Sequence, residues 1–283
     1  MKIFIDTYSK LDMERSLFEY FEIGKEELLD LFYEADRESN KDSFTDDQIF
    51  NDVINSFIET RINYDELTHM LFFHLSRRLN DTYQDSPGLN LYELLTKPTT
   101  MSLFLKDHGI VFEPEGTKLN LLFNGRLIPL DDNYKHESSY LRWRLGHTRR
   151  IDFCFNGFML KDQIYKNHYA RDLAAVPEFI NVLANYLGDK NIGNDYIKNS
   201  EYFCFEYCVP IEKVIFDSDD YTAINNKPLY VINRVLNRLH DYYAYEERYV
   251  FDHDNPILRL RDDDIMEHEY FVTKEKISHS MLK

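Results

Sequence analysis

The sequence is poor in the residues that build linkers, disulfide frameworks and membrane spans. It has nine glycines and eight prolines among 283 residues, and three cysteines without the spacing of a structural zinc site. No apolar run approaches the roughly 18 residues that a membrane helix needs. The first residues, MKIFIDTYSK, lack the apolar core of a signal peptide. These absences predict a protein of the reducing cytoplasm without long flexible linkers.

Common nucleotide-binding and hydrolase motifs are absent as well. The chain contains neither G-x-G-x-x-G nor G-x-x-x-x-G-K-[ST], which weighs against dinucleotide-binding, kinase and NTPase folds. It also lacks the G-x-S-x-G turn of serine hydrolases.

Aromatic residues and acidic charge are abundant instead. The chain has 21 tyrosines and 21 phenylalanines and a net charge of −17, which together describe a globular and acidic protein. Residues 1–66 carry 18 acidic and 7 basic side chains, a net of −11, and the other 217 residues carry 32 and 26, a net of −6. This asymmetry predicts a separate N-terminal unit that repels nucleic-acid phosphate.

The order of apolar patterns predicts an α+β protein with two domains. Residues 1–66 are expected to form an acidic helical unit, divided at Gly24 and with a capping box from Thr45 to Gln48. Residues 67–283 are expected to form an α+β core, a split mixed or antiparallel β-sandwich. The elements expected in the core are strands at 69–74, 110–112, 118–123, 126–130, 151–155, 201–208, 211–216, 248–251, 257–260 and 270–273, and helices at 98–107, 138–145, 174–187 (kinked at Pro177 or started there) and 228–243.

Glu206 is the most unusual residue of this pattern. It stands within a predicted strand among aromatics, cysteines and valine, and alternation places it on one face with Cys204 and Cys208. A buried lone charge is costly unless it is paired, neutralised or used. Glu206 is therefore either an edge residue that faces water or a catalytic acid in a cleft.

Other candidates each have a structural alternative. His74 ends a buried strand, where it can donate to a ligand hydroxyl or be a satisfied half-buried histidine. Tyr165 and Tyr169 lie in a polar loop, where they can stack on a flat ring or simply pack. The basic cluster with Arg142 and Arg144 suits phosphate or carboxylate recognition, or surface pairing with the acidic unit.

No metal site is predicted. The segments Phe251–Asp254 and Glu267–Glu269 combine histidine with carboxylates, but neither has the spacing of a known site. A metal-dependent nuclease or phosphodiesterase would also need an ordered carboxylate and lysine motif, which the sequence lacks.

The order of three motifs resembles the bacterial ADP-ribosyltransferase fold, in its histidine, tyrosine and glutamate branch. The resemblance covers about residues 68–216 and rests on FFHLS at 72–76, DFCFNGF at 152–158 and FCFEYCVPIEKV at 203–214. It implies a split β-sandwich that cleaves NAD and transfers ADP-ribose. Leu75-Ser76 departs from the small residue and threonine that follow the family's histidine.

The resemblance assigns roles to four residues. It implies that His74 binds the ribose hydroxyl and amide side of NAD, and that Tyr165 or Tyr169 stacks on nicotinamide. It implies that Glu206 bonds the ribose 2′-hydroxyl and stabilises the cation that develops as nicotinamide leaves. The acceptor, protein or nucleic acid, stays open, and by analogy the enzyme would be a toxin or phage-defence effector.

A non-enzymatic function is the alternative. The acidic residues 1–66 would then dock a basic protein partner, as an antitoxin, inhibitor or regulatory module does, and Glu206 would face solvent.

Overall fold

A computed structural model describes most of the chain, as two compact units. The described residues are 4–40, 46–63, 66–80, 88–130, 136–217, 226–252, 254–282. Unit 1 comprises Met1–Phe73, Phe158–Asn167 and Cys208–Leu258, and unit 2 comprises His74–Gly157, His168–Tyr207 and Arg259–Lys283. All of the predicted acidic region 1–66 therefore belongs to unit 1, together with later segments of the chain.

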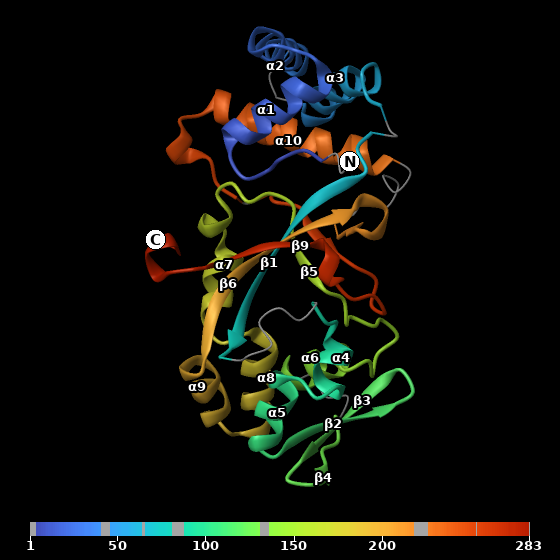
Figure 1. Ribbon diagram of the computed structural model, residues 1–283, viewed down its shortest axis with the longest axis vertical. Coiled ribbons are helices and arrows are strands. Elements are labelled where there is room, and N and C mark those ends of the chain that lie inside the picture. The colour runs from blue at the N-terminus through green and yellow to red at the C-terminus, as the bar shows by residue number, and fades with distance from the viewer. Residues whose placement is uncertain are drawn as a thin grey trace. The chain divides into compact units, whose positions relative to one another are not determined.

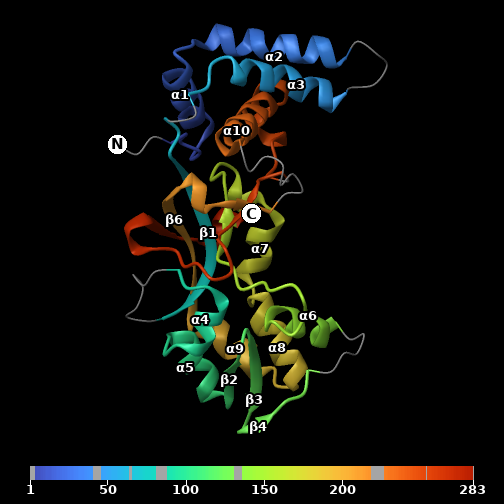
Figure 2. The same cartoon turned by 90° about the vertical axis from the view of Figure 1, so that its right-hand side faces the viewer.

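Unit 1 contains four longer helices, which Figures 1 and 2 show. They are α1 (Lys10–Phe21), α2 (Lys25–Ser39), α3 (Asp47–Glu59) and α10 (Lys227–Ala244). The predicted division at Gly24 is confirmed, because Glu22 ends α1 in the left-handed conformation and Gly24 caps α2. Asp46 caps α3 by accepting from the backbone N–H groups of Gln48 and Ile49. Thr45 of the predicted capping box lies outside the described residues.

The strands confirm the α+β class and form two sheets. The larger has the order β7-β8-β5-β1-β6-β9, and the smaller is the antiparallel β2-β3-β4 meander. The asparagine and glycine at 124–125 turn β3 into β4, as predicted, with positive φ at both residues. The bounds are β1 (His69–Leu79), β2 (Ile110–Glu115), β3 (Lys118–Phe123), β4 (Arg126–Leu127), β5 (Asn156–Phe158), β6 (Ser200–Pro210), β7 (Ile215–Phe216), β8 (Ile257–Arg259) and β9 (Phe271–Lys276).

The described part of unit 2 has six α-helices around a core of aliphatic and aromatic side chains. They are α4 (Leu91–Thr96), α5 (Thr100–Asp107), α6 (His136–Arg144), α7 (His168–Ala174), α8 (Glu178–Leu187) and α9 (Asn191–Lys198). The core includes Leu105, Leu121, Leu141, Ile180 and Leu183. Of the alternatives predicted for 174–187, the helix that starts at Pro177 and is ended by Gly188 is confirmed: Pro177 is the N-cap residue of α8 and Gly188 its C-cap residue, and residues 175–176 separate α8 from α7. No helix in the described ranges combines the length and apolarity that crossing a bilayer requires.

Two predicted strands are wrong. Residues 151–155 form no strand because the backbone N–H groups of Phe153 and Cys154 donate to the Asp262 carboxylate, at 2.7 and 3.1 Å. Strand pairing begins only at β5, where Phe158 is opposite Phe73. In place of the strand predicted at 248–251, the chain forms the short 3-10 helix Glu247–Tyr249.

A buried ion cluster connects three segments of unit 1. Arg238 of α10 is 0% exposed, and its Nη2 donates to Asp252 at 2.7 Å and to Asp254 at 2.9 Å. Its Nη1 lies 3.5 Å from Asp162, whose carboxylate also accepts from the Tyr242 hydroxyl. Burial by itself lowers the pKa of Arg238, and the three carboxylates outweigh that effect and raise it. The cluster therefore joins α10 to the segments around 162 and 252.

Removing the buried guanidinium is expected to destabilise unit 1 strongly. Arg238→Ala leaves Asp252 and Asp162 buried without their cation, which costs about 3–5 kcal/mol in such clusters. Urea unfolding measures this loss, and Arg61→Ala, which removes an exposed ion pair with Glu27, is the control at below about 1 kcal/mol. Equal losses in the two variants would contradict a structural role for the cluster.

Asp162 should make the stability depend on pH. Burial raises the pKa of its carboxyl from 3.8 to about 6, against the opposing effect of Arg238. The folded state therefore keeps this proton at pH values where the unfolded chain loses it, and the stabilisation present below pH 3.8 is lost as the pH rises through 6. Between pH 4 and 7, wild type should lose up to about 3 kcal/mol relative to Asp162→Asn. Denaturant titrations of both proteins would measure this, and parallel curves would contradict it.

Candidate functional site

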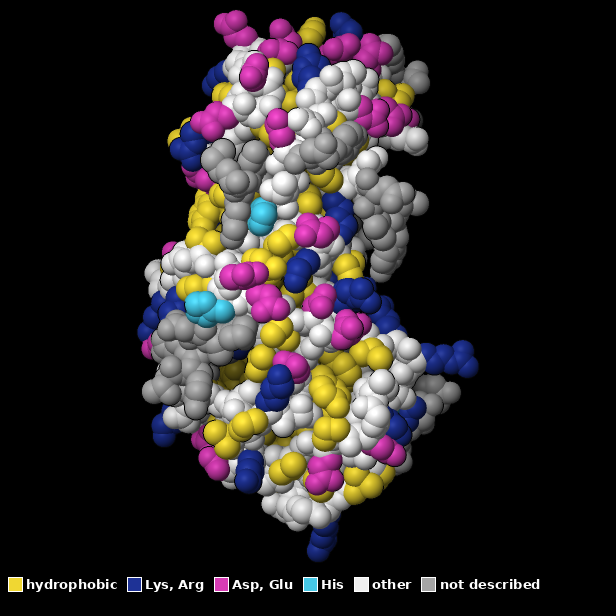
Figure 3. Space-filling model, turned by 45° about the vertical axis from the view of Figure 1, so that its right-hand side comes forward, with side chains coloured by type: hydrophobic (Ala, Val, Ile, Leu, Met, Phe, Trp, Pro, Cys, Tyr) yellow, Lys and Arg dark blue, Asp and Glu magenta, His cyan; other side chains and the backbone are white. Residues whose placement is uncertain are grey.

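A cavity of about 470 Å³ lies in unit 2, a volume that suits a small organic ligand. Side chains of β1, β6 and β9 line it, together with α4, the turn before α5 and the beginning of α8. The lining is largely apolar and includes Leu91, Leu94, Met101, Phe179, Phe203 and Phe205. In Figure 3, hydrophobic side chains gather over unit 2 among charged ones. The cavity therefore offers an apolar interior to a ligand.

Arg78 brings a positive charge into this apolar lining. Its guanidinium carbon lies 5.1 Å from the centre of the Phe205 ring, a cation–π arrangement. Its Nε is shielded from solvent, and within the described part of the chain it has no hydrogen-bond partner and no carboxylate forms an ion pair with Arg78. A buried donor without an acceptor costs about 1–3 kcal/mol, more when charged. An anionic ligand in the cavity would pair with the guanidinium charge of Arg78, which no carboxylate of the described residues neutralises.

The neighbouring arginine has a different environment. Arg77 donates from Nε to the Ser200 hydroxyl at 3.0 Å, and from Nη1 and Nη2 to the carbonyls of Ala174 and Ser200 at 2.8 Å each. Successive side chains on a strand point to opposite faces, so the two guanidinium groups meet different partners, although both residues contribute to the cavity lining. Arg77 thus links β1 to β6 and α7, and its donors are used inside the protein.

Two further features of the cavity favour an anion. The helix α5 begins at the cavity, where Thr100 and Met101 line it, and a helix N-terminus carries partial positive charge. Lys97 and Lys274 also contribute to the lining. Lys97 is partly neutralised by Glu93 at 2.9 Å, so Arg78 is the cation best placed to hold a ligand.

His74 lies four residues before Arg78 on β1, and so on the same side of the sheet. Its ring is 4.2 Å from that of Phe155 and 6.3 Å from that of Phe205, and its Nδ1 hydrogen-bonds to the Asn156 carbonyl at 2.7 Å. Burial, and then the charge of Arg78, lowers the pKa of His74 to about 3. The imidazole is therefore neutral at physiological pH, with Nδ1 as the donor.

Glu206 is buried, with 1% of its surface exposed, so the water-facing alternative is wrong. The extra residue in the β6–β9 pairing, Val272, lies on β9, so β6 keeps its alternation. Glu206 thus shares a face with Tyr202, whose hydroxyl donates to the Ala170 carbonyl of α7. His74 contacts Phe205 on the opposite face. The structure therefore does not bring the two predicted catalytic side chains together.

The two candidate tyrosines lie in different units. Tyr165 belongs to the 3-10 turn Ile164–Lys166 of unit 1, and Tyr169 to α7 of unit 2. Tyr169 is 48% exposed, and its ring lies 4.1 Å from that of His168. Of the two, only Tyr169 is in the same unit as His74.

Arg142 and Arg144 are bound within unit 2. Arg142 donates to the Leu130 carbonyl at 2.9 Å, and Arg144 forms a close ion pair with Asp152. The predicted pairing with the acidic N-terminal region is therefore not what neutralises Arg144. Neither arginine lines the cavity described above.

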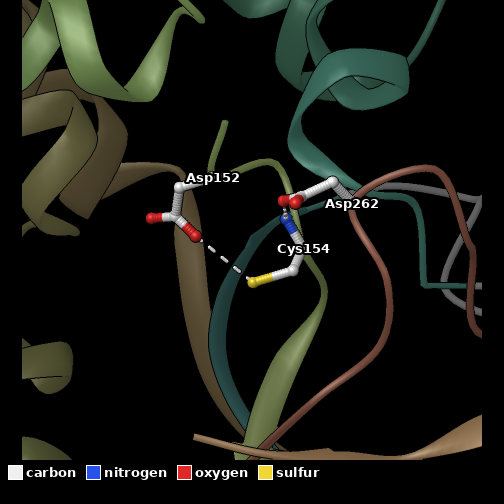
Figure 4. A group of neighbouring side chains, drawn as sticks. All are labelled: Asp152, Cys154 and Asp262. Atoms are coloured by element: carbon white, nitrogen blue, oxygen red, sulfur yellow. Dashed lines mark hydrogen bonds between the residues drawn. The ribbon is translucent and has the colours of Figure 1, made fainter. Parts of the chain in front are cut away.

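A second group of polar side chains, Asp152, Cys154 and Asp262, lies close together in unit 2 (Figure 4). The thiol of Cys154 donates to Asp152 at 3.3 Å, and burial raises its pKa to about 12. Asp152 is already paired with Arg144, and Asp262 already accepts two backbone N–H groups. These contacts explain the group as a structural brace.

Asp262 should therefore matter for stability. Asp262→Ala removes the acceptor of the Phe153 and Cys154 N–H groups and is expected to cost about 1–3 kcal/mol of unfolding free energy. Asp263→Ala is the matched control, because the Asp263 side chain is 80% exposed. Its ion pair with Arg261, at 3.6 Å, lies at the surface. Thermal or urea unfolding measures both, and an unaffected Asp262→Ala would contradict the brace.

Comparisons with known proteins found no match: no family model, curated protein or solved structure resembles the chain significantly. The resemblance to ADP-ribosyltransferases thus gains no support from relatives. The residue that the sequence analysis missed is Arg78. In the sequence, Arg78 is marked by a pair of arginines at the end of an apolar strand pattern. The fold is needed to show that Arg77 has hydrogen-bond partners in the protein and that Arg78 differs from it.

Proposed function

We propose that unit 2 binds a small organic anion that joins an aromatic or aliphatic body to a phosphate or carboxylate group. The observation that carries this proposal is the charge of Arg78, which lines a cavity of about 470 Å³ and forms no ion pair with a carboxylate of the described residues. Arginine forms paired hydrogen bonds to phosphate and carboxylate groups, and these charged bonds are the strong ones. The apolar body would pack against Phe203, Phe205 and Leu94.

NAD belongs to this chemical class, since it has phosphates and aromatic rings. Its cleavage by the predicted residues has less support, because His74 and Glu206 belong to opposite faces of the sheet. We therefore propose ligand binding in the cavity as the function. ADP-ribosyl transfer is tested separately, by nicotinamide release from NAD.

The test uses three matched probes. 1-Naphthyl phosphate has both the ring and the anion, 1-naphthol only the ring, and inorganic phosphate only the anion. We expect 1-naphthyl phosphate to bind more tightly than either, by calorimetry. Arg78→Met should weaken it by about 10–100-fold, as loss of a charged hydrogen bond does.

Lys106→Met is the control, because Lys106 is exposed near the other end of α5 and does not line the cavity. Its affinity for 1-naphthyl phosphate should match that of wild type. Equal binding of 1-naphthol, or an unaffected Arg78→Met, would refute the role of the anion. Nicotinamide release from NAD that disappears in folded Glu206→Gln would instead support the transferase resemblance.

A further inference from the structure

The outward face of α2 in unit 1 carries exposed apolar side chains. Leu29 is 37% exposed and Tyr33 is 70% exposed. They are four residues apart, so they are neighbours along one side of the helix. The opposite side of α2 is buried, through Leu28, Leu31, Phe32 and Ala35, and packs against α3. The fold of unit 1 therefore does not need Leu29 and Tyr33 for its core.

An acidic row runs beside this apolar pair. Glu26, Asp30 and Glu34 are spaced by four residues and are all exposed. Within the described ranges, Glu26 and Asp30 take part in no ion pair, and Glu34 lies 4.0 Å from Arg37, which is closer to Glu38 at 3.2 Å. The row keeps most of its negative charge. We call Glu26, Leu29, Asp30, Tyr33 and Glu34 together the α2 face.

We propose that the α2 face is a docking surface for a basic amphipathic helix of another protein. Apolar anchors at a spacing of four beside a row of carboxylates match a helix that carries leucines beside lysines or arginines at the same spacing. Opposite charges across the rim would accelerate association and make it sensitive to salt.

Charge selects this partner among the possible ones. Residues 1–66 have 18 acidic and 7 basic side chains, a net of −11. A second copy of α2 would place carboxylates against carboxylates, and nucleic acid or an anionic lipid surface would be repelled as well. A basic partner alone both covers the apolar pair and neutralises the acidic row.

The probe is a synthetic lysine and leucine helix of about four turns, long enough to form on binding. A scrambled peptide of the same composition, which has no apolar face, is its control. We expect the full-length protein to bind the amphipathic peptide more tightly, by fluorescence anisotropy. The affinity should fall steeply as the salt concentration rises from about 0.05 to 0.5 M.

Two sets of variants locate the site. Leu29→Ser with Tyr33→Ser, and Glu26→Gln with Asp30→Asn and Glu34→Gln, should each weaken binding by about 10-fold. Leu11→Ser and Glu19→Gln on α1 are the matched controls, since Leu11 is 73% exposed and Glu19 is also exposed, and they should change it by less than about 3-fold. Because all these positions are exposed, the variants should fold. Losses in the α1 controls as large as those in the α2 variants, equal binding of the scrambled peptide, or binding that salt leaves unchanged would overturn the proposal.

Discussion

The neutralisation of buried charge is the constraint on which both units depend. In unit 1 a fully buried arginine, Arg238, is held by Asp252 and Asp254 and lies beside Asp162. In unit 2 Arg144 is paired with Asp152, and Asp262 accepts two backbone N–H groups. Such groups give little net stability as pairs, but removing one partner is costly. They therefore specify which distant segments must come together.

The two adjacent arginines of β1 differ in how their charge is satisfied. Arg77 donates hydrogen bonds to Ser200 and Ala174, and these bonds connect β1 to β6 and α7. Arg78, one residue later, lines the same cavity as Arg77 but forms no ion pair with a carboxylate of the described residues. A charge that the fold leaves unmatched is a physical reason to expect a ligand. On α2, the exposed carboxylates next to Leu29 and Tyr33 point in the same way to a partner of opposite charge.

The candidate site shows how far residue patterns reach. They identified Glu206 as an acid in an apolar strand, and its burial excludes the water-facing alternative. They could not place it relative to His74, because the two residues are far apart in sequence and their faces depend on how β1 and β6 pair. The contacts of His74 with Phe205, and of Tyr202 with α7, put the two on opposite sides. The cavity was not predictable, since its lining comes from six stretches of the described chain, at 76–80, 89–101, 177–180, 196, 203–205 and 274.

Local preference determined much of the secondary structure directly. The α+β class, the helices on either side of Gly24, the hairpin at Asn124 and the long helix α10 follow from apolar periodicity and turn residues, which act over a few neighbours. Tertiary structure decided the rest. It kept residues 151–155 out of a strand, because the side chain of Asp262, more than a hundred residues away, takes their N–H groups. It also gave two adjacent arginines different environments, because neighbouring residues on a strand face opposite ways and only long-range packing decides what each meets.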